Sequence, residues 1–230
     1  TLQSFTRYDA LGRLVETAVP TADGLAYTYY FYDGLNRLIG TRDNQGHETH
    51  VEYDDTHSRV ITTAPNGLQT LSIYDHSGLL LSTQTLRAQQ DYGTQHYRYD
   101  DQGRLIAKTD TDGNTAYFFY DARGNLKAEV SARGETLEYR YDEDGRCIQT
   151  IHHASLLDTQ NWQKSLPAWS SIQPQAHALD RTTQTIYNPQ GEPAWQIDTT
   201  GALIGFRYDA QGHLIEKRAY ANLLTAFDKN

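Results

Sequence analysis

The chain has 230 residues, is 38% hydrophobic and carries a formal net charge of −9 at pH 7. This acidic balance argues against binding to nucleic acid or to anionic membranes, which both require a basic face, and no apolar run is long enough for a membrane span. Tyr and Gly each account for 17 residues. That composition is typical of half-buried strands joined by many turns, so we predict an all-β fold.

A Tyr-Asp pair recurs from one end of the chain to the other. The copies are Tyr8-Asp9, Tyr32-Asp33, Tyr53-Asp54, Tyr74-Asp75, Tyr99-Asp100, Tyr120-Asp121, Tyr141-Asp142 and Tyr208-Asp209, with Tyr187-Asn188 as a ninth, softened copy. Five of the eight steps between copies are 21 residues long. This regular spacing identifies an internal repeat.

Each copy extends into a longer frame. Four residues after the Tyr, seven of the nine copies carry glycine: Gly12, Gly78, Gly103, Gly124, Gly145, Gly191 and Gly212. The Asp side chain can accept a hydrogen bond from a backbone amide two residues on, and glycine tolerates the positive φ of such turns. A Leu follows two residues after the Gly in most copies. We therefore predict an antiparallel strip of repeated β-hairpins, with strands that end at the Tyr and begin at the Leu.

The repeated "YD-x-x-G-R-L" frame resembles the Rhs/YD-repeat family, which includes bacterial Rhs polymorphic toxins, the B and C components of insecticidal Tc toxins, and teneurins. The resemblance covers essentially the whole chain. Copies depart from the frame at Asn36 and His57, where Gly is missing, at Arg59 and Pro193, where Leu is missing, and at Asn188. In this family such strips spiral into a hollow shell that encloses a toxic C-terminal domain or the protein's own chain.

The repeats divide the chain into four parts. We predict about seven YD repeats in residues 1–150, an insertion with a short helix and a loop in 151–186, further repeats in 187–220, and the truncated start of a second insertion in 221–230. The helix is expected near 155–170, over about 158–166, with Asp158 or Thr159 as its N-cap and Pro167 after its end.

Two further observations support the view that the chain is a piece of a larger protein. "HASLL" at 153–157 lines up with "YANLL" at 220–224, 67 residues later. Met is absent, including at position 1.

Motifs that suggest a metal have simpler interpretations. "HETH" at 47–50 lacks the second His spacing of a metalloprotease helix and lies in a predicted strand, and His152 and His153 point to opposite strand faces. "DTDGN" at 110–114 resembles the start of a calcium loop, but its Gly is fourth rather than sixth, which favours an ordinary turn over calcium. We expect no cofactor.

Catalytic motifs are missing as well. The sequence contains no nucleophile elbow, P-loop or dinucleotide fingerprint. In the toxins that the chain resembles, a core domain cleaves its own chain near a "DPxGL"-like motif, and residues 188–191 lack both its Asp and its Leu. Cys147, the only cysteine, occupies a frame Leu position, which favours an apolar filler over a reactive thiol. We predict that the protein is not an enzyme.

The aromatic residues have two interpretations. Tyr residues bound to the frame favour a structural ladder of rings over a stacking platform for sugars. Aromatic residues off the frame are better ligand candidates: Tyr92, Trp162, Trp169 and Trp195. If these rings are buried against neighbouring repeats, a structural role is favoured. If they form an exposed patch, ligand binding is favoured.

Two functional hypotheses follow. The first is a non-catalytic wall segment of a large bacterial shell or surface stalk, related to toxins, whose partners are flanking YD repeats and an enclosed C-terminal toxin domain. About 18 strands at about 4.8 Å give a strip of about 85 Å, too short to enclose a folded cargo alone. The second is an adhesin module that binds surface glycans or a protein partner. The resemblance implies a secreted or cell-surface location.

Strand edges at the two ends of the strip also predict self-association of this chain. A strict monomer across a concentration series in sedimentation would contradict that expectation.

Overall fold

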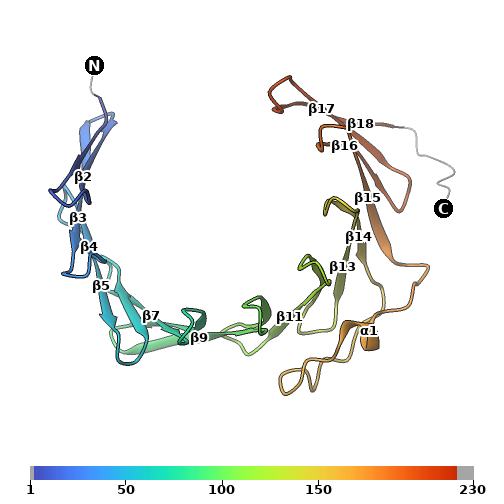
Figure 1. Ribbon diagram of the computed structural model, residues 1–230, viewed down its shortest axis with the longest axis horizontal. Coiled ribbons are helices and arrows are strands. Elements are labelled where there is room, and N and C mark those ends of the chain that lie inside the picture. The colour runs from blue at the N-terminus through green and yellow to red at the C-terminus, as the bar shows by residue number, and fades with distance from the viewer. Residues whose placement is uncertain (1–2, 222–230) are drawn as a thin grey trace. The chain divides into compact units, whose positions relative to one another are not determined.

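The computed structural model describes residues 3–221 and divides into two units (Figure 1). Unit 1 is residues 1–104 with 108–113, and unit 2 is residues 105–107 with 114–230. Unit 1 contains β1 (Phe5–Tyr8), β2 (Leu14–Thr21), β3 (Gly24–Tyr32), β4 (Leu38–Asp43), β5 (Glu48–Asp54), β6 (Arg59–Thr63), β7 (Leu68–Tyr74), β8 (Leu80–Arg87) and β9 (Gln90–Tyr99). Unit 2 contains β11 (Thr115–Tyr120), β12 (Leu126–Val130), β13 (Thr136–Tyr141), β14 (Cys147–His152), α1 (Trp169–Ile172), β15 (Arg181–Tyr187), β16 (Pro193–Asp198), β17 (Leu203–Tyr208) and β18 (Leu214–Ala219). Residues of β10 (Leu105–Thr109) belong to both.

Within each unit, strands that follow one another in the chain pair antiparallel. In unit 1 this holds from β1–β2 to β8–β9, and in unit 2 from β11–β12 to β17–β18. Strands end at the frame Tyr and begin at the frame Leu, as at Tyr141 and Leu126. The all-β class and the strip of repeated hairpins are confirmed.

A β-bulge recurs just before the frame Tyr. In the β13–β14 hairpin, Arg140 pairs with Gln149 but Tyr141 pairs with Cys147, so that Ile148 has no partner across the ladder. The same register shift precedes the frame Tyr in the hairpins that begin with β1, β3, β7, β11, β15 and β17. Bulges bend a strand and increase its twist, so the frame sets the local bend of each hairpin.

The frame turns adopt the predicted geometry, and two departures are explained. Gly145 has a φ of 79° and donates its N–H to the Asp142 carbonyl at 3.1 Å. In the second copy Asn36 takes the glycine position with a φ of 64°, which Asn tolerates better than most residues. In the third copy Ser58 has a φ of 49°, and Asp54 pairs directly with Arg59 without a bulge. That hairpin therefore keeps its register with a different turn.

The insertion differs in detail from the prediction. It leaves the strands over residues 153–180, a shorter stretch than 151–186, because β14 runs to His152 and β15 begins at Arg181. The helix described in residues 3–221 is α1, which begins after Pro167, so the placement over 158–166 is wrong. The Asp158 carboxylate does accept the Gln160 N–H at 3.1 Å, as an N-cap would, but residues 160–164 form turns and not a helix.

The well-buried core lies in unit 2. Its residues are Ala107, Tyr117, Phe119, Ala128, Val130, Trp162 and Trp169, with Leu157, Leu166 and Ile172 packed against them. Most side chains of unit 1 are only half-buried. No helix within residues 3–221 is long and apolar enough to cross a membrane. Most of the predicted second insertion, residues 222–230, lies outside the described part of the chain.

Candidate functional site

In most copies the frame Asp organises its turn through both carboxylate oxygens, whereas at Asp75 the Oδ1 atom accepts the N–H groups of Ser77 and Leu79. In the seventh copy, Asp142 Oδ1 accepts the backbone N–H groups of Asp144 and Arg146 at 3.1 and 2.9 Å, and its Oδ2 accepts Arg146 Nε–H at 2.7 Å. The same two-sided pattern is formed by the pairs Asp9–Arg13, Asp33–Arg37 and Asp100–Arg104. We call this Asp–Arg arrangement the turn latch. In the softened copy the polarity is reversed, because Asn188 Nδ2 donates to Glu192 Oε2 at 2.8 Å.

The frame Tyr and Arg join each hairpin to its neighbour. The Tyr141 hydroxyl donates to the Leu126 carbonyl at 2.7 Å, so a frame Tyr bonds the residue that opens a strand in the preceding copy. The other Tyr–carbonyl pairs are Tyr32–Leu14, Tyr53–Leu38, Tyr120–Leu105 and Tyr187–Cys147. The Arg37 guanidinium lies 4.1 Å from the centre of the Tyr53 ring of the next copy, and Arg13 and Arg146 lie similarly over Tyr32 and Tyr187. The structural interpretation of the frame is thus supported by direct contacts.

Removing one of these hydroxyls tests the ladder. Tyr141→Phe is expected to lower the free energy of unfolding by about 0.5–1.5 kcal/mol, because the half-buried Leu126 carbonyl loses its donor. Urea unfolding followed by circular dichroism measures the change. Tyr92→Phe, at an exposed ring, is the matched control. Equal stability of wild type and Tyr141→Phe would contradict the ladder.

The frame turns lower the pKa of several of their Asp carboxyl groups. The backbone N–H of the residue four positions on is the largest cause at Asp9, Asp33 and Asp209, where it holds the pKa below the usual value. At Asp142, burial acts to raise the pKa, and the hydrogen bonds from Arg146 outweigh it. These four carboxylates therefore favour the charged state in the folded chain.

This depression predicts acid lability. Because the folded pKa lies below the unfolded value of about 3.9, the latches stabilise the fold fully above that pH and lose this contribution as pH falls through the folded pKa. We expect the midpoint of urea unfolding to fall between about pH 5 and about pH 2. In Asp142→Asn this fall should be smaller, since the amide keeps an acceptor oxygen but does not titrate. A midpoint that does not change with pH would contradict the prediction.

The two tryptophans of the insertion form the centre of the unit 2 core. Trp162 is 6% exposed and Trp169 is 8% exposed. The Trp162 ring lies edge-on to Tyr117 and Phe119, with centroids 5.2 and 5.8 Å apart, and Trp169 lies 5.2 Å from Phe119. This burial corrects the expectation that these two rings are ligand candidates, because the hairpins cover their faces.

The other two candidates stay accessible. Tyr92 on β9 is 51% exposed and Trp195 on β16 is 37% exposed. Trp195 packs against Tyr220, with centroids 5.7 Å apart, and against Gly205. Tyr92 belongs to unit 1 and Trp195 to unit 2. Their role in ligand binding stays a prediction.

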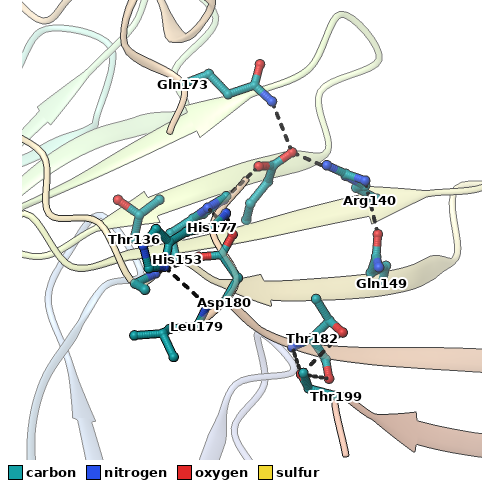
Figure 2. Close-up of polar contacts among 12 residues, drawn as sticks. Thr136, Arg140, Gln149, His153, Gln173, His177, Leu179, Asp180, Thr182 and Thr199 are labelled. Atoms are coloured by element: carbon teal, nitrogen blue, oxygen red, sulfur yellow. Dashed lines mark hydrogen bonds and ion pairs between the residues drawn. The ribbon is translucent and has the colours of Figure 1, made fainter. Parts of the chain in front are cut away.

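A buried polar cluster, missed by the sequence analysis, holds the two ends of the insertion (Figure 2). His153 Nε2 lies 2.9 Å from Glu138 Oε2, and His153 Nδ1 lies 3.5 Å from Asp180 Oδ2. The other Glu138 oxygen contacts Arg140 Nε at 3.4 Å and Gln173 Nε2 at 3.5 Å. We call Glu138, His153 and Asp180 the clamp, because it ties β13 to the residues at which the insertion begins and ends.

The Asp180 side of the clamp is also fixed by backbone groups. Its carboxylate accepts the N–H groups of Ala154 and His177 at 2.8 and 2.9 Å. Burial acts to raise the pKa of Asp180, but these hydrogen bonds outweigh it and hold the pKa below the usual value. The two carboxylates lie at opposite nitrogens of one imidazole, so they cannot converge on a single metal ion.

Two members of the clamp each line an open groove of unit 2. One, of about 570 Å³, is lined by His152, His153 and Arg181 among others. The second, of about 660 Å³, is lined by residues that include Glu138 and Arg140. Charges of both signs line each groove, which gives no single class of ligand an advantage.

The motifs that suggested metals form local contacts. His47 Nδ1 lies 2.8 Å from Asp43 Oδ2 in a turn, and His50 Nε2 lies 3.2 Å from Glu48 Oε2 on β5. Asp110 accepts the N–H of Asp112 at 2.9 Å as an ordinary turn. Within residues 3–221 no group of three or more His, Cys, Asp or Glu side chains is placed to hold a metal ion.

Cys147 begins β14 and is half-buried. Burial raises the pKa of its thiol, which disfavours the reactive thiolate. Its carbonyl accepts the Tyr187 hydroxyl at 2.9 Å, as the frame Leu carbonyls do in other copies. These contacts are those of a frame position.

These features define the class of the protein: a β-hairpin repeat protein in which recurring contacts link one repeat to the next. Residues 120–155 match the model of the RHS Repeat family. The matched range runs from the frame Tyr of β11 to the start of the insertion. The resemblance to the Rhs/YD-repeat family drawn from the Tyr-Asp frame is thereby confirmed. No curated protein matches the sequence.

Several solved structures show similarity. The crystal structures of TcdB2-TccC3-TEV and TcdB2-TccC3-Cdc42 are 13% and 14% identical, each with a TM-score of 0.37 over 94% of this chain and 16% of theirs. A porin-like protein from Bacteroides uniformis is 11% identical, with a TM-score of 0.35 over 94% of this chain and 87% of its own. The chain thus spans about one sixth of the TcdB2-TccC3 chains.

Proposed function

We propose that this chain is a non-catalytic wall segment of a large Rhs/YD-repeat bacterial protein, which forms an encapsulating shell or surface stalk linked to a toxin. The proposal includes no enzymatic step and no cofactor, and it places the protein outside the cell that makes it. The observation that carries it is the ladder of contacts between repeats: the frame Tyr hydroxyls bond the preceding copy, and the frame Asp and Arg close the turns.

The insertion supports the same role. Its tryptophans add to the core of unit 2, and its two ends are held by the clamp. An insertion packed in this way makes the wall thicker. Its two tryptophan rings are buried, so they have no face exposed to a ligand. We therefore propose that the insertion is a brace on the hairpins.

Protease protection of the full-length gene product tests the wall. We expect segments of that product outside the repeats to survive trypsin while the wall is folded, and to be cleaved faster in Trp162→Ala, which weakens the brace. Leu156→Ala, at a leucine that is 64% exposed, is the control. Cleavage of those segments at the same rate in wild type and Trp162→Ala would contradict enclosure.

The adhesin alternative now depends on the exposed rings of Tyr92 and Trp195. A glycan array probed with the wild type, Tyr92→Ala and Trp195→Ala tests it. Saturable binding that either substitution removes would replace the wall with an adhesive module. If a folded sample binds no glycan on the array, the wall segment stays the proposed function.

A further inference from the structure

One ring nitrogen of the clamp has no hydrogen-bond partner. His153 Nε2 lies 2.9 Å from Glu138 Oε2, but His153 Nδ1 is buried and forms no hydrogen bond within residues 3–221. Asp180 Oδ2 lies 3.5 Å from this nitrogen (Figure 2). The side chains of Glu138, His153 and Asp180 are 3%, 4% and 8% exposed. Buried polar atoms without a partner are rare in folded proteins, so this nitrogen is an exception.

The distances within the clamp show how many protons it can use. One proton must lie between His153 Nε2 and Glu138 Oε2, because two lone pairs do not attract each other at 2.9 Å. A neutral imidazole carries its single proton on one nitrogen only. When that proton is on Nε2, Nδ1 presents a lone pair to the Asp180 carboxylate. A second proton, on Nδ1, would turn this contact into one between a donor and an acceptor.

The surroundings place the second proton on the ring and not on Asp180. The Asp180 carboxylate accepts the N–H groups of Ala154 and His177 at 2.8 and 2.9 Å, and such bonds favour its charged form. Carboxyl groups therefore face both nitrogens of one buried imidazole. A doubly protonated ring can donate to both of them, whereas a singly protonated ring can donate to one.

The clamp carboxyl groups are the charged groups that contact the His153 ring. Arg140, on β13, is directed to Glu138 at 3.4 Å. The His177 ring accepts the Leu179 N–H at 3.1 Å, and α1 carries no charged residue. The remaining charged or titratable residues near the ring line the groove of about 570 Å³ beside it: Glu129, Glu135, His152 and Arg181. That groove is open to solvent, so its charges are screened.

The path of the backbone does not by itself require a titratable group. His153 N–H donates to Thr136 O at 3.0 Å, and Tyr220 N–H, 67 residues on, donates to Leu203 O at 3.0 Å. At the second place Gly205 stands where the first has the clamp glutamate. The same backbone contact therefore forms with an aromatic residue in place of histidine and with no carboxyl group in the glutamate position. The clamp adds a property that the second place lacks, which is a response to protons.

We propose that the clamp is a proton-dependent lock on the insertion. A proton on His153 Nδ1 attracts the Asp180 carboxylate and fixes the residue at which the insertion ends. Loss of this proton leaves a lone pair facing the carboxylate, so the Asp180 end loosens. Histidine ordinarily gains or loses a proton between about pH 5 and about pH 8. The contribution of the lock is therefore present at the acidic end of this range and is lost as pH rises, opposite to the turn latches.

Nuclear magnetic resonance of the whole chain tests the protonation directly. Long-range proton–nitrogen correlation spectra separate imidazole nitrogens that carry a proton from those that carry a lone pair. We expect His153 to carry protons on both nitrogens at about pH 6 and to lose the Nδ1 proton by about pH 8.5. Comparison with His153→Gln identifies its signals. An Nδ1 atom that keeps one state throughout this range would overturn the lock.

Acrylamide quenching of Trp162 and Trp169 tests the loosening. Every sample carries Trp195→Phe, which leaves these two as the only tryptophans. We expect quenching to increase from about pH 6 to about pH 8.5. His153→Gln keeps a side-chain N–H donor but does not titrate, so its quenching should equal that of the wild type at the higher pH throughout. His152→Gln, at an exposed neighbour, is the matched control and should keep the wild-type response.

Two results of the quenching experiment would overturn the lock. One is quenching that does not change with pH in the wild type, and the other is an unchanged pH response in His153→Gln. The inference rests on the proposed brace, but its failure can be told from that of the wall. If segments outside the repeats are cleaved equally fast in wild type and Trp162→Ala, the wall fails, whereas a pH response that depends on His153 would still establish the lock.

Discussion

Trp162→Ala is expected to lower the free energy of unfolding of unit 2 by about 3–5 kcal/mol, the range for removing a large buried aromatic side chain. The ring is 6% exposed and contacts Tyr117 and Phe119 of β11 from the insertion. Its removal leaves a cavity between the insertion and the hairpins. Urea unfolding followed by far-ultraviolet circular dichroism measures the loss.

Leu156→Ala is the control for this substitution. It lies in the same insertion but is exposed, so its effect should stay within about 0.5 kcal/mol. If Trp162→Ala were as stable as Leu156→Ala, the insertion would not be part of the core, and the correction made for Trp162 would fail.

Glu138→Ala is expected to cost about 1–3 kcal/mol, because it leaves the buried His153 Nε2 without its hydrogen-bond partner. Glu138 and His153 are both buried, and their side chains are 2.9 Å apart. The substitution also removes the acceptor for Gln173 at the end of α1. Thermal unfolding at neutral pH, with and without the substitution, gives the difference.

The control for Glu138→Ala is a substitution of an exposed carboxylate on the neighbouring turn. Glu143→Ala removes the same charge from the surface and should change stability little. A loss in Glu138→Ala no larger than that in Glu143→Ala would mean that the clamp contributes no stability. Trypsin cleavage after Lys164 should also quicken in Glu138→Ala if the insertion loosens.

The hairpin strip could be predicted because each copy of the frame repeats the same evidence. The turn at Asp142–Gly145 depends on residues close together in the sequence. They are an Asp whose side chain accepts hydrogen bonds from backbone N–H groups and a Gly with positive φ. Arg146 is part of the frame in the sequence, but the frame alone does not predict its role in the latch. Its contacts with its own Asp142, with Asp144 and with Tyr187 of the next copy appear only in the folded chain.

The insertion was harder to predict because its structure depends on contacts distant in sequence. Pro167 and the possible N-caps favoured a helix before the proline, yet Trp162 instead turns onto Tyr117, 45 residues earlier. The clamp joins Glu138 to Asp180 through His153, and no local pattern links those positions. Tertiary packing of the two indoles outweighs the local helix signals.

We propose that the insertion is a fixed brace of the wall and not a free binding loop. Hydrogen exchange followed by mass spectrometry measures this directly in the whole chain. We predict that the Leu157 amide, bonded to Gly134, and the Gln173 amide, bonded to Trp169 at the end of α1, exchange as slowly as those of β12 and β13. Rapid exchange throughout residues 153–180, beside protected strands, would contradict the brace and favour a loop available to a ligand.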